Sequence, residues 1–231
     1  MKSVVVGSGG REHALAHVLG RDSDVTVTPG NPGIPNSTTQ SPLNIDADLF
    51  VIGPEAPLVD GLADQLRAQG KTVFGPGVDG AQLEGSKAWM KDLLVEANVP
   101  TAKHGTFTNE DEAIAFLSDM PLPYVIKTDG LAAGKGVIVT ESVNEAKDAI
   151  KNYLSGDAFG DAGKTVVIEE GLIGNEISIL AICDGTKAVP LAPAQDYKRL
   201  LNNDEGPNTG GMGAYSPIPS VSEDFVTQIM E

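Results

Sequence analysis

The chain has 231 residues, 41% of them hydrophobic and 21% charged, so it can bury one large core or two small ones. Its formal net charge is −16, from 32 acidic and 16 basic residues. This acidity argues against a general nucleic-acid binder, which needs a basic surface. If the protein binds an anionic ligand, its few cations must gather at one place.

The single cysteine, Cys183, excludes an internal disulfide and fits a reducing compartment. It follows the apolar run Ile177–Ile182, so we expect a buried structural thiol. No apolar run reaches the length of a membrane span, and residues 1–20 lack the charged and then apolar regions of a signal peptide. These features predict a cytoplasmic protein without a membrane partner.

The chain opens with an apolar strand, Ser3–Val6, which is followed by a glycine turn and a helix. This order is typical of a mononucleotide-binding unit, with Gly9, Gly10 and Arg11 as donors to a phosphate at the helix N-terminus. The dinucleotide fingerprint G-x-G-x-x-G is incomplete, because Glu12 stands at its third glycine position. Binding of NAD is therefore disfavoured.

His13 and His17 lie at the spacing of two zinc ligands on a helix. The metalloprotease pattern needs Glu directly after the first His, and Ala14 stands there instead. We favour helix packing or substrate contact for both residues and predict no metal site in the chain.

Leu49–Ile52 is the next predicted strand, and it ends in G-P-E-A-P-L-V. Pro54 and Glu55 would then lie at the carboxyl end of a parallel strand, where open α/β sheets bind ligands. An exposed turn explains the same two residues about equally well. A helix over Leu58–Gln69 and a strand over Thr72–Gly75 are expected next.

A further helix is predicted from about Gly85–Lys87 to Ala97, and Asn98 and Pro100 end it. Lys87 lies in its first turn, where the helix dipole disfavours a cation. Such a lysine is either solvated or directed at an anionic ligand, and the pattern leaves both readings open.

Two β-branched runs, Tyr124–Lys127 and Val137–Thr140, flank a loop rich in glycine and lysine. A hairpin of this kind brings backbone N–H groups and ammonium groups to one point, which suits a polyphosphate. A mobile surface hairpin is the alternative. Predicted helices lie on both sides, at Glu110–Leu117 and at Ser142–Leu154, the second with a capping box formed by Ser142 and Glu145.

The predicted strand Thr165–Ile168 runs into E-E-G-L, residues 169–172, and strands over Ile177–Cys183 and Ala188–Leu191 follow. The E-E-G-L peptide is either a hinge whose backbone faces an adenine edge or an exposed acidic turn. The last segments are Q-D-Y-K-R, residues 195–199, and a glycine- and proline-rich stretch, residues 206–217. We expect no regular structure in this stretch, and long loops of this type are functional or disordered.

Six segments in this order resemble the glycinamide ribonucleotide synthetase (phosphoribosylamine–glycine ligase) family of ATP-grasp enzymes. One glycine loop alone is a weak signal, whereas six in register along the whole chain are specific. The segments are G-S-G-G-R-E-H-A-L at 7–15, G-P-E-A-P-L at 53–58, E-G-S-K-A at 84–88, D-G-L-A-A-G-K-G-V at 129–137, A-F-G-D-A-G at 158–163 and G-P-N-T-G-G-M-G-A-Y-S-P at 206–217.

The resemblance implies an α/β protein with an N-terminal Rossmann-like (pre-ATP-grasp) parallel-sheet domain, an ATP-grasp α+β lid and part of the ATP-grasp core. The expected boundaries are residues 1–84 for the substrate-binding domain and 85–106 for the first core segment. The lid would cover residues 107–175, and the second core segment would begin at 176–231 and be incomplete.

The resemblance also implies a ligase of purine biosynthesis that joins 5-phosphoribosylamine to glycine through a glycyl phosphate, with ATP split to ADP and phosphate. Catalysis would depend on positioning and electrostatics. The chain agrees, because it shows no Ser/His/Asp or Cys/His constellation. ATP and Mg²⁺ (or Mn²⁺) are the implied cofactors and small molecules the only implied partners, with the oligomeric state left open.

The resemblance assigns the ATP site to two lysines that face the phosphates, a loop that closes over them, a hinge that reads adenine and a carboxylate on the ribose. In that order the residues are Lys87 and Lys127; Gly134, Lys135 and Gly136; Glu169, Glu170 and Leu172; and Glu176.

The resemblance assigns phosphoribosylamine to two segments of the first domain, and the meeting of glycine with the sugar phosphate to two later segments. The first-domain residues are Gly9, Gly10, Arg11, Glu12, Pro54 and Glu55, and the later ones are Asp196, Lys198, Arg199, Asn208, Thr209, Gly210 and Gly211. Of all these site residues, we expect a catalytic role for Lys127, Asp196, Lys198 and Arg199.

The chain departs from the family in three places. Between Pro29 and Leu49 it is shorter than its relatives, which leaves the strand count of the first domain open. Tyr197 stands where many relatives carry His. The family continues past residue 231 and supplies its magnesium-binding Glu and Asn there, so we expect residues 1–231 alone to be catalytically impaired or inactive.

Three other classes compete with this interpretation. Another ATP-grasp ligase would share the hairpin and hinge but not residues 206–217. An NAD-binding oxidoreductase would rest on residues 7–13 alone, and Glu12 counts against it. A nucleotide-binding module would bind ATP without turnover.

Overall fold

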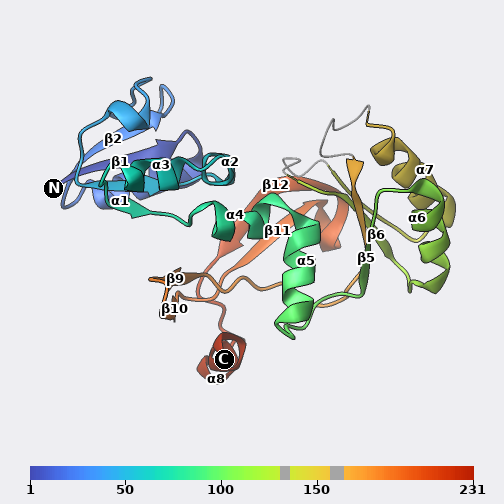
Figure 1. The fold of residues 1–231 in the computed structure, drawn as a ribbon. Helices are drawn as coiled ribbons and strands as arrows, with labels where there is room; N and C mark the ends of the chain where they lie inside the picture. Colours follow the sequence, from blue (N-terminus) through green and yellow to red (C-terminus); the bar gives the residue numbers. More distant parts are fainter. Residues whose placement is uncertain (131–135, 157–163) are drawn as a thin grey trace. The chain divides into compact units, whose positions relative to one another are not determined.

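A computed structural model describes residues 1–130, 136–156 and 164–231 of the chain (Figure 1). Its contacts divide the chain into two compact units, Met1–Gly171 and Leu172–Glu231. Within the described ranges, no helix is both long enough and apolar enough to cross a membrane.

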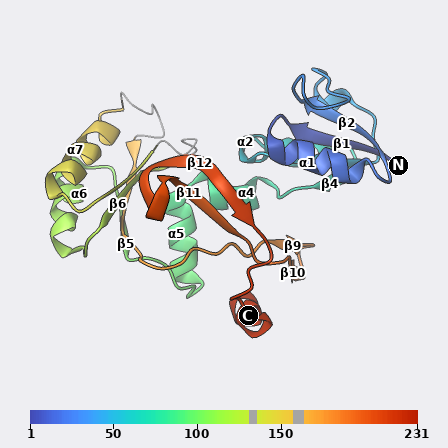
Figure 2. The ribbon, with the colours of Figure 1, turned by 180° about the vertical axis from the view of Figure 1, so that it is seen from behind.

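The first unit begins with a parallel sheet of the order β2-β1-β3-β4. Helices pack on both faces of this sheet, and Figure 2 shows α1 lying against β1 and β2. One face buries Val4, Phe50 and Leu66, and the other buries Val5 and Val27. The bounds are β1 Lys2–Gly7, α1 Gly10–Leu19, β2 Asp24–Pro29, β3 Leu49–Ile52, α2 Glu55–Val59, α3 Leu62–Ala68, β4 Val73–Phe74 and α4 Val78–Gly85.

Two features of this region differ from the sequence prediction. The single helix expected over Leu58–Gln69 is two helices, α2 and α3, because Gly61 adopts φ +81° between them and starts a new N-terminus. Helix α4 was not predicted at all. The short segment 30–48, fully described, adds a 3₁₀ turn at Pro42–Asn44 and one isolated bridge, so the sheet has four strands.

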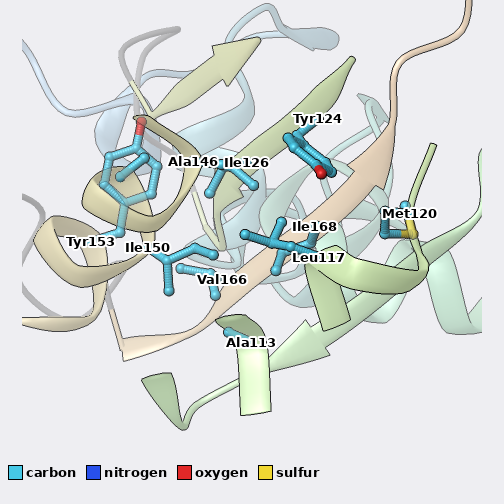
Figure 3. Packing of buried hydrophobic residues seen from close by; sticks show 11 residues of the cluster. Ala113, Leu117, Met120, Tyr124, Ile126, Ala146, Ile150, Tyr153, Val166 and Ile168 are labelled. Atoms are coloured by element: carbon cyan, nitrogen blue, oxygen red, sulfur yellow. The ribbon is translucent and has the colours of Figure 1, made fainter. Parts of the chain in front are cut away.

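A second sheet in the first unit is antiparallel and has the order β5-β8-β6-β7. Its bounds are β5 His104–Phe107, β6 Tyr124–Thr128, β7 Val137–Thr140 and β8 Val166–Glu170, and it follows helix α5, Lys87–Glu96. Helices α6, Glu110–Phe116, and α7, Val143–Leu154, cover one face. Figure 3 shows the core between these helices and the sheet, in which Leu117, Ile126, Ile150 and Ile168 are almost fully buried.

The alternation of side chains along these strands fixes the position of the functional groups. Ile126 and Thr128 are buried on the side of the helices, so Lys127 points to the opposite face. Glu169 follows the buried Ile168 on β8 in the same way. Both polar side chains therefore occupy the face that α6 and α7 leave open.

The predicted capping box of α7 is only half correct. Ser142 does cap the helix, because its hydroxyl accepts a hydrogen bond from the Glu145 N–H. The Glu145 carboxylate accepts a hydrogen bond from the Thr140 hydroxyl, and the Ser142 N–H donates to that same hydroxyl oxygen. Thr140, at the end of β7, thus lies between the two expected partners.

The second unit consists of two hairpins and a helix: β9 Ala181–Cys183 with β10 Ala188–Pro190, β11 Gln195–Leu201 with β12 Glu205–Tyr215, and α8 Glu223–Met230. The expectation of an irregular segment over residues 206–217 was wrong, because β11 supplies the backbone partners for β12. Positive φ values at Gly206, Gly211 and Gly213 accompany the register shifts of this pair.

Two further predictions for this unit were wrong. The strand expected over Ile177–Cys183 begins only at Ala181, although Ser178 forms an isolated bridge with Ala194. Cys183 is an exposed free thiol rather than a buried one. In the described part of the chain, β9 pairs with β10 alone, so this short hairpin exposes its side chains.

Candidate active site

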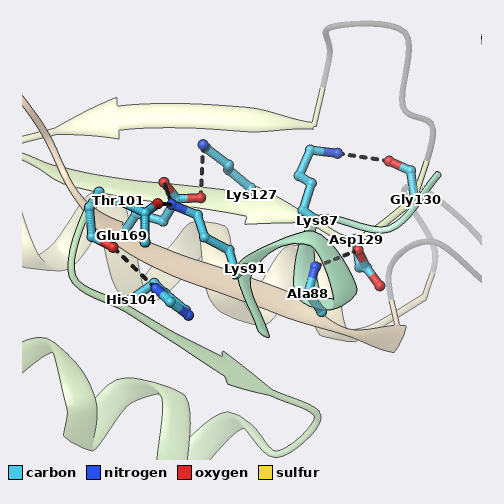
Figure 4. A network of polar contacts seen from close by, with 10 residues as sticks. Lys87, Ala88, Lys91, Thr101, His104, Lys127, Asp129, Gly130 and Glu169 are labelled. Carbon is cyan, nitrogen blue, oxygen red and sulfur yellow. Dashed lines mark hydrogen bonds and ion pairs between the residues drawn. The ribbon is translucent and has the colours of Figure 1, made fainter. Parts of the chain in front are cut away.

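The most buried charged group among the described residues of the antiparallel sheet is the Glu169 carboxylate, which lies between two lysines (Figure 4). Its Oε1 is 2.8 Å from Nζ of Lys127 on β6, and its Oε2 is 2.9 Å from Nζ of Lys91 on α5. The Lys91 ammonium also donates to the Thr101 hydroxyl at 2.7 Å. The Glu169 carboxylate on β8 thereby connects strand β6 with helix α5.

The Glu169 carboxylate is ionised in this setting. Burial acts to raise its pKa, but the neighbouring ammonium groups of Lys127 and Lys91 outweigh burial and hold the pKa below the usual value. Among the described residues, Oε1 accepts no well-aligned hydrogen bond, although the Lys127 ammonium is at ion-pair distance. The Lys127 side chain retains 25% exposure, compared with 5% for Lys91, so Lys127 is the lysine that can reach a ligand.

Lys87 is the first residue of α5, and its ammonium donates to the Gly130 carbonyl at 2.8 Å. Burial lowers the pKa of Lys87, and the positive charge of Lys127 lowers it further, against an opposing effect of Asp129. Lys87 is therefore not simply solvated, which removes one of the two readings left open by the sequence. The Lys87 ammonium lies at the start of the glycine loop because it contacts Gly130, and Lys127 lies beside the same loop near the end of β6 (Figure 4).

Asp129 connects this loop to α5. Its carboxylate accepts hydrogen bonds from the Ser86 hydroxyl at 3.0 Å and from the Ala88 N–H at 3.2 Å. A carboxylate at a helix N-terminus satisfies free N–H groups and complements the helix dipole. The first residues of the loop are thus fastened to the helix that carries Lys87.

The predicted phosphate loop is described only at its ends. Gly134 and Lys135 lie outside the described residues. Gly136 accepts a hydrogen bond from the Thr128 N–H at 2.9 Å and so continues the β6–β7 pairing. The hairpin itself is confirmed, with Lys127 opposite Val137.

The predicted hinge residues lie in two different settings. Glu169 and Glu170 belong to the last two positions of β8 rather than to a turn, and Glu170 Oε1 accepts from the Lys103 N–H at 2.8 Å. Leu172 is the first residue of the second unit and is 75% exposed. Glu176 also belongs to the second unit.

The first-domain residues converge at the carboxyl ends of β1 and β3. Arg11 donates to Glu12 and to Glu55, each at 3.2 Å. Glu12 is 4% exposed, and its Oε2 accepts from the Gly9 N–H at 2.7 Å. The structure thus brings the predicted residues together, with Glu12 turned inward and Arg11 exposed.

Two carboxylates, those of Glu12 and Glu55, face the Arg11 guanidinium. Burial acts to lower the pKa of Arg11, but the hydrogen bonds that Arg11 donates to Glu55 and Glu12 outweigh burial and raise the pKa. The pKa of Glu55 is lowered, first by a hydrogen bond from its own backbone N–H at the start of α2 and then by Arg11. An exposed cation beside the helix N-termini of α1 and α2 is suited to an anionic ligand.

In the second unit, the Lys198 ammonium lies 3.1 Å from Glu176 and 2.8 Å from Asp196. The hydrogen bond to Asp196 is the main cause that raises the Lys198 pKa. Arg199 donates to the Gly206 carbonyl at 2.6 Å, and the Thr209 hydroxyl donates to the Lys198 carbonyl at 2.9 Å.

Gly210 and Gly211 continue β12 beside Thr209, and the Gly211 N–H donates to the Thr209 hydroxyl at 3.0 Å. The Asn208 side chain lies outside what the structure describes. Five of the predicted residues of this unit therefore form one β11–β12 cluster with Glu176: Asp196, Lys198, Arg199, Thr209 and Gly211.

Sequence reasoning missed Lys91, Thr101 and Asp129 as parts of the site. The available signal for Lys91 is its place one helical turn after Lys87, on the same face of α5. Asp129 stands within the conspicuous glycine motif, yet only the fold shows its contact with α5. Thr101 carries no signal in the sequence.

Two protein-family models match the chain and together cover all of it. Residues 85–231 match the family described as "Phosphoribosylglycinamide synthetase, ATP-grasp (A) domain", which agrees with the antiparallel sheets of this region. Residues 1–84 match "Phosphoribosylglycinamide synthetase, N domain", which agrees with the parallel sheet. The chain belongs to the phosphoribosylglycinamide synthetase family, and the predicted α/β fold class and family resemblance are confirmed.

Individual relatives agree along the whole chain. It is 49% identical to the phosphoribosylamine–glycine ligase of Xylella fastidiosa and 47% identical to that of Escherichia coli K12, with 100% of this chain and 57% and 58% of those proteins covered. A crystal structure of phosphoribosylamine–glycine ligase from Thermotoga maritima superposes with a TM-score of 0.85 at 33% identity, covering 99% of this chain and 58% of that one. The chain thus spans somewhat more than half the length of these relatives.

Proposed function

We propose that the chain binds ATP and takes part in the phosphoribosylamine–glycine ligase reaction, which forms glycinamide ribonucleotide in purine biosynthesis. The observation that carries this proposal is the pair of ammonium groups at the start of the glycine loop, Lys87 from α5 and Lys127 from β6. Relatives that cover the whole chain are named for this ligase. A cytoplasmic location belongs to the same proposal.

In the proposed reaction, a carboxylate oxygen of glycine attacks the γ-phosphorus of ATP, and ADP leaves. The amine of phosphoribosylamine then attacks the acyl carbon, loses a proton and displaces phosphate. Both steps develop negative charge on oxygen, so positioned cations supply the stabilisation. Lys87 and Lys127 are the residues to which we assign that role on the phosphates.

We assign the remaining contacts as follows. Residues 1–84 bind phosphoribosylamine through Arg11 and the N–H group of Gly10; the Gly9 N–H is held by Glu12, and Glu55 orients the guanidinium. Residues 107–175 form the lid, flanked by core segments 85–106 and 176–231. In the second unit, Glu176 binds the ribose hydroxyl groups of ATP, and Lys198, which pairs with Glu176, helps to bring glycine and the sugar phosphate together.

The ATP-grasp family uses Mg²⁺ with ATP. Within the described ranges, however, no group of three or more His, Cys, Asp and Glu side chains is placed to bind a metal ion. We therefore assign no residue of this chain to the metal.

Two measurements on the 231-residue chain test the proposal. Calorimetric titration should detect ATP binding, and its absence at millimolar ATP would contradict the proposed function. ADP release that requires both glycine and phosphoribosylamine would identify the ligase reaction itself. Binding of ATP without such turnover would favour the second candidate, a nucleotide-binding module.

A further inference from the structure

Lys91 is a lysine with almost no access to solvent. Its side chain is 5% exposed, and its ammonium is occupied by the Glu169 carboxylate at 2.9 Å and by the Thr101 hydroxyl at 2.7 Å. A buried ammonium is costly unless it is paired and hydrogen-bonded, and both partners are supplied by the fold. Lys91 therefore cannot itself contact a nucleotide, and its effect must pass through its partners.

The cluster of Lys91, Glu169 and Lys127 has two positive charges and one negative charge. Each oxygen of Glu169 faces a different lysine, Oε2 the buried Lys91 and Oε1 the more exposed Lys127. Without Lys91, the buried carboxylate would have Lys127 as the one cation at ion-pair distance among the described residues and would bind it as a neutral pair. With Lys91 present, the cluster has a net positive charge, and its accessible end is Lys127.

We propose that Lys91 is a positioning residue for the phosphate-facing Lys127: it neutralises Glu169 from the buried side, so that the Lys127 ammonium stays available to an anionic phosphate. This inference rests on the proposed function, since it takes Lys127 as a residue that faces the ATP phosphates. It assigns to α5 a second role, beside that of carrying Lys87.

A purely structural role for Lys91 makes a different prediction. If the residue only supports the fold, its loss should weaken every ligand of the site to the same extent. If it acts through Lys127, its loss should weaken ligands with a polyphosphate and spare adenosine, which has none. The ratio of ATP affinity to adenosine affinity therefore separates the two roles.

The test uses Lys91→Met, which removes the charge with little change in length, and calorimetric titration of the 231-residue chain with ATP and with adenosine. We expect ATP affinity to fall about tenfold and adenosine affinity to change less than about twofold. In the double variant Lys91→Met/Glu169→Gln no carboxylate remains to hold Lys127, and the backbone through which the hinge would face adenine is unchanged, so ATP affinity should recover most of the loss. Thr101→Val removes only the hydrogen bond from Lys91, so it should lower ATP affinity by less than Lys91→Met does and should also spare adenosine affinity. This variant replaces Lys91→Met in the test if Lys91→Met does not fold.

Equal losses for ATP and adenosine, or no recovery in the double variant, would overturn the inference while leaving the proposed function intact. An unchanged ATP affinity in Lys91→Met would overturn it as well. Failure of the unmodified chain to bind ATP is a separate outcome, which contradicts the proposed function and this inference with it.

Discussion

The ammonium of Lys127 lies 2.8 Å from a carboxylate oxygen of Glu169, although the two residues are not directly opposite each other on their strands. Lys127 pairs with Val167, so Glu169 is its diagonal neighbour on the same face of the sheet. The position of the Lys127 side chain thus depends on Glu169, the next-to-last residue of β8. Four predictions follow from this arrangement and from the first domain.

Lys127→Ala should weaken ATP binding by about tenfold or more, because an ammonium group at the phosphates is lost. The Lys91–Glu169 pair remains in this variant, so the fold should persist. The measurement is calorimetric titration with ATP, and the control is Lys147→Ala on α7, the helix that covers the face of the sheet opposite to Lys127. Equal affinities for the two variants would refute the assignment of Lys127.

Glu169→Gln should destabilise the chain by about 2–3 kcal/mol at pH 7, because two lysines lose their buried counter-charge. The pKa of Glu169 is lower in the folded chain than in the unfolded chain, where it is about 4.3. The ionised carboxylate therefore stabilises the folded chain fully above the unfolded pKa, and this stabilisation is lost as the pH falls through the pKa of the folded chain. Urea unfolding of both proteins should show a difference in free energy that is largest at neutral pH and shrinks below about pH 4.

The matched control for this prediction is Glu110→Gln. Glu110 pairs with Lys151 at 3.8 Å, and both side chains are about half exposed, so the loss should be under about 1 kcal/mol at any pH. A Glu169→Gln variant with the same small, pH-independent effect would contradict the ionised state of the buried carboxylate.

Gly53→Ala should destabilise the first domain by about 2 kcal/mol, because a Cβ there would overlap the Glu12 side chain. Glu12 is buried and held by the Gly9 N–H, so it cannot move aside freely. Thermal unfolding monitored by circular dichroism provides the measurement. Gly10→Ala is the control, since a Cβ at Gly10 meets nothing within 4 Å, and its unfolding temperature should stay the same or rise.

Arg11→Ala should weaken binding of ribose 5-phosphate, used as a stable probe of the first-domain site, by about tenfold. The effect should shrink as salt is added, because Arg11 is exposed and its attraction is screened. Arg21→Ala, just beyond the end of α1, is the comparison. A loss of the same size in both variants would indicate a general charge effect and remove Arg11 from the site.

Much of the fold was predictable because local signals were strong. The strand at Leu49–Ile52, the helix at Lys87–Glu96 and the β6–β7 hairpin follow from apolar runs bounded by glycine, serine and proline, and each lies where the sequence indicated. The break at Gly61 and the strand β12 were not predictable in the same way. The first depends on one φ value, and the second on pairing with the neighbouring strand β11, because the glycine- and proline-rich sequence of β12 has no strand pattern of its own.

The residues of the candidate site also divide into those with a local sequence signal and those without one. Lysines beside glycine motifs are visible in the sequence, and Lys87 and Lys127 were found in that way. Lys91 and Thr101 were missed. Lys91 matters because it pairs with the Glu169 carboxylate on a strand more than sixty residues later, and Thr101 matters because it accepts a hydrogen bond from Lys91. Pairings of this kind depend on the sheet order, which no local pattern specifies.

The central claim is that Lys87 and Lys127 together receive the phosphates of ATP. The most direct measurement is a crystal structure of the chain with a non-hydrolysable ATP analogue. The account predicts phosphate oxygens within about 4 Å of both ammonium groups, with Lys91 still bound to Glu169. A triphosphate bound elsewhere on the chain, with neither lysine in contact, would contradict it.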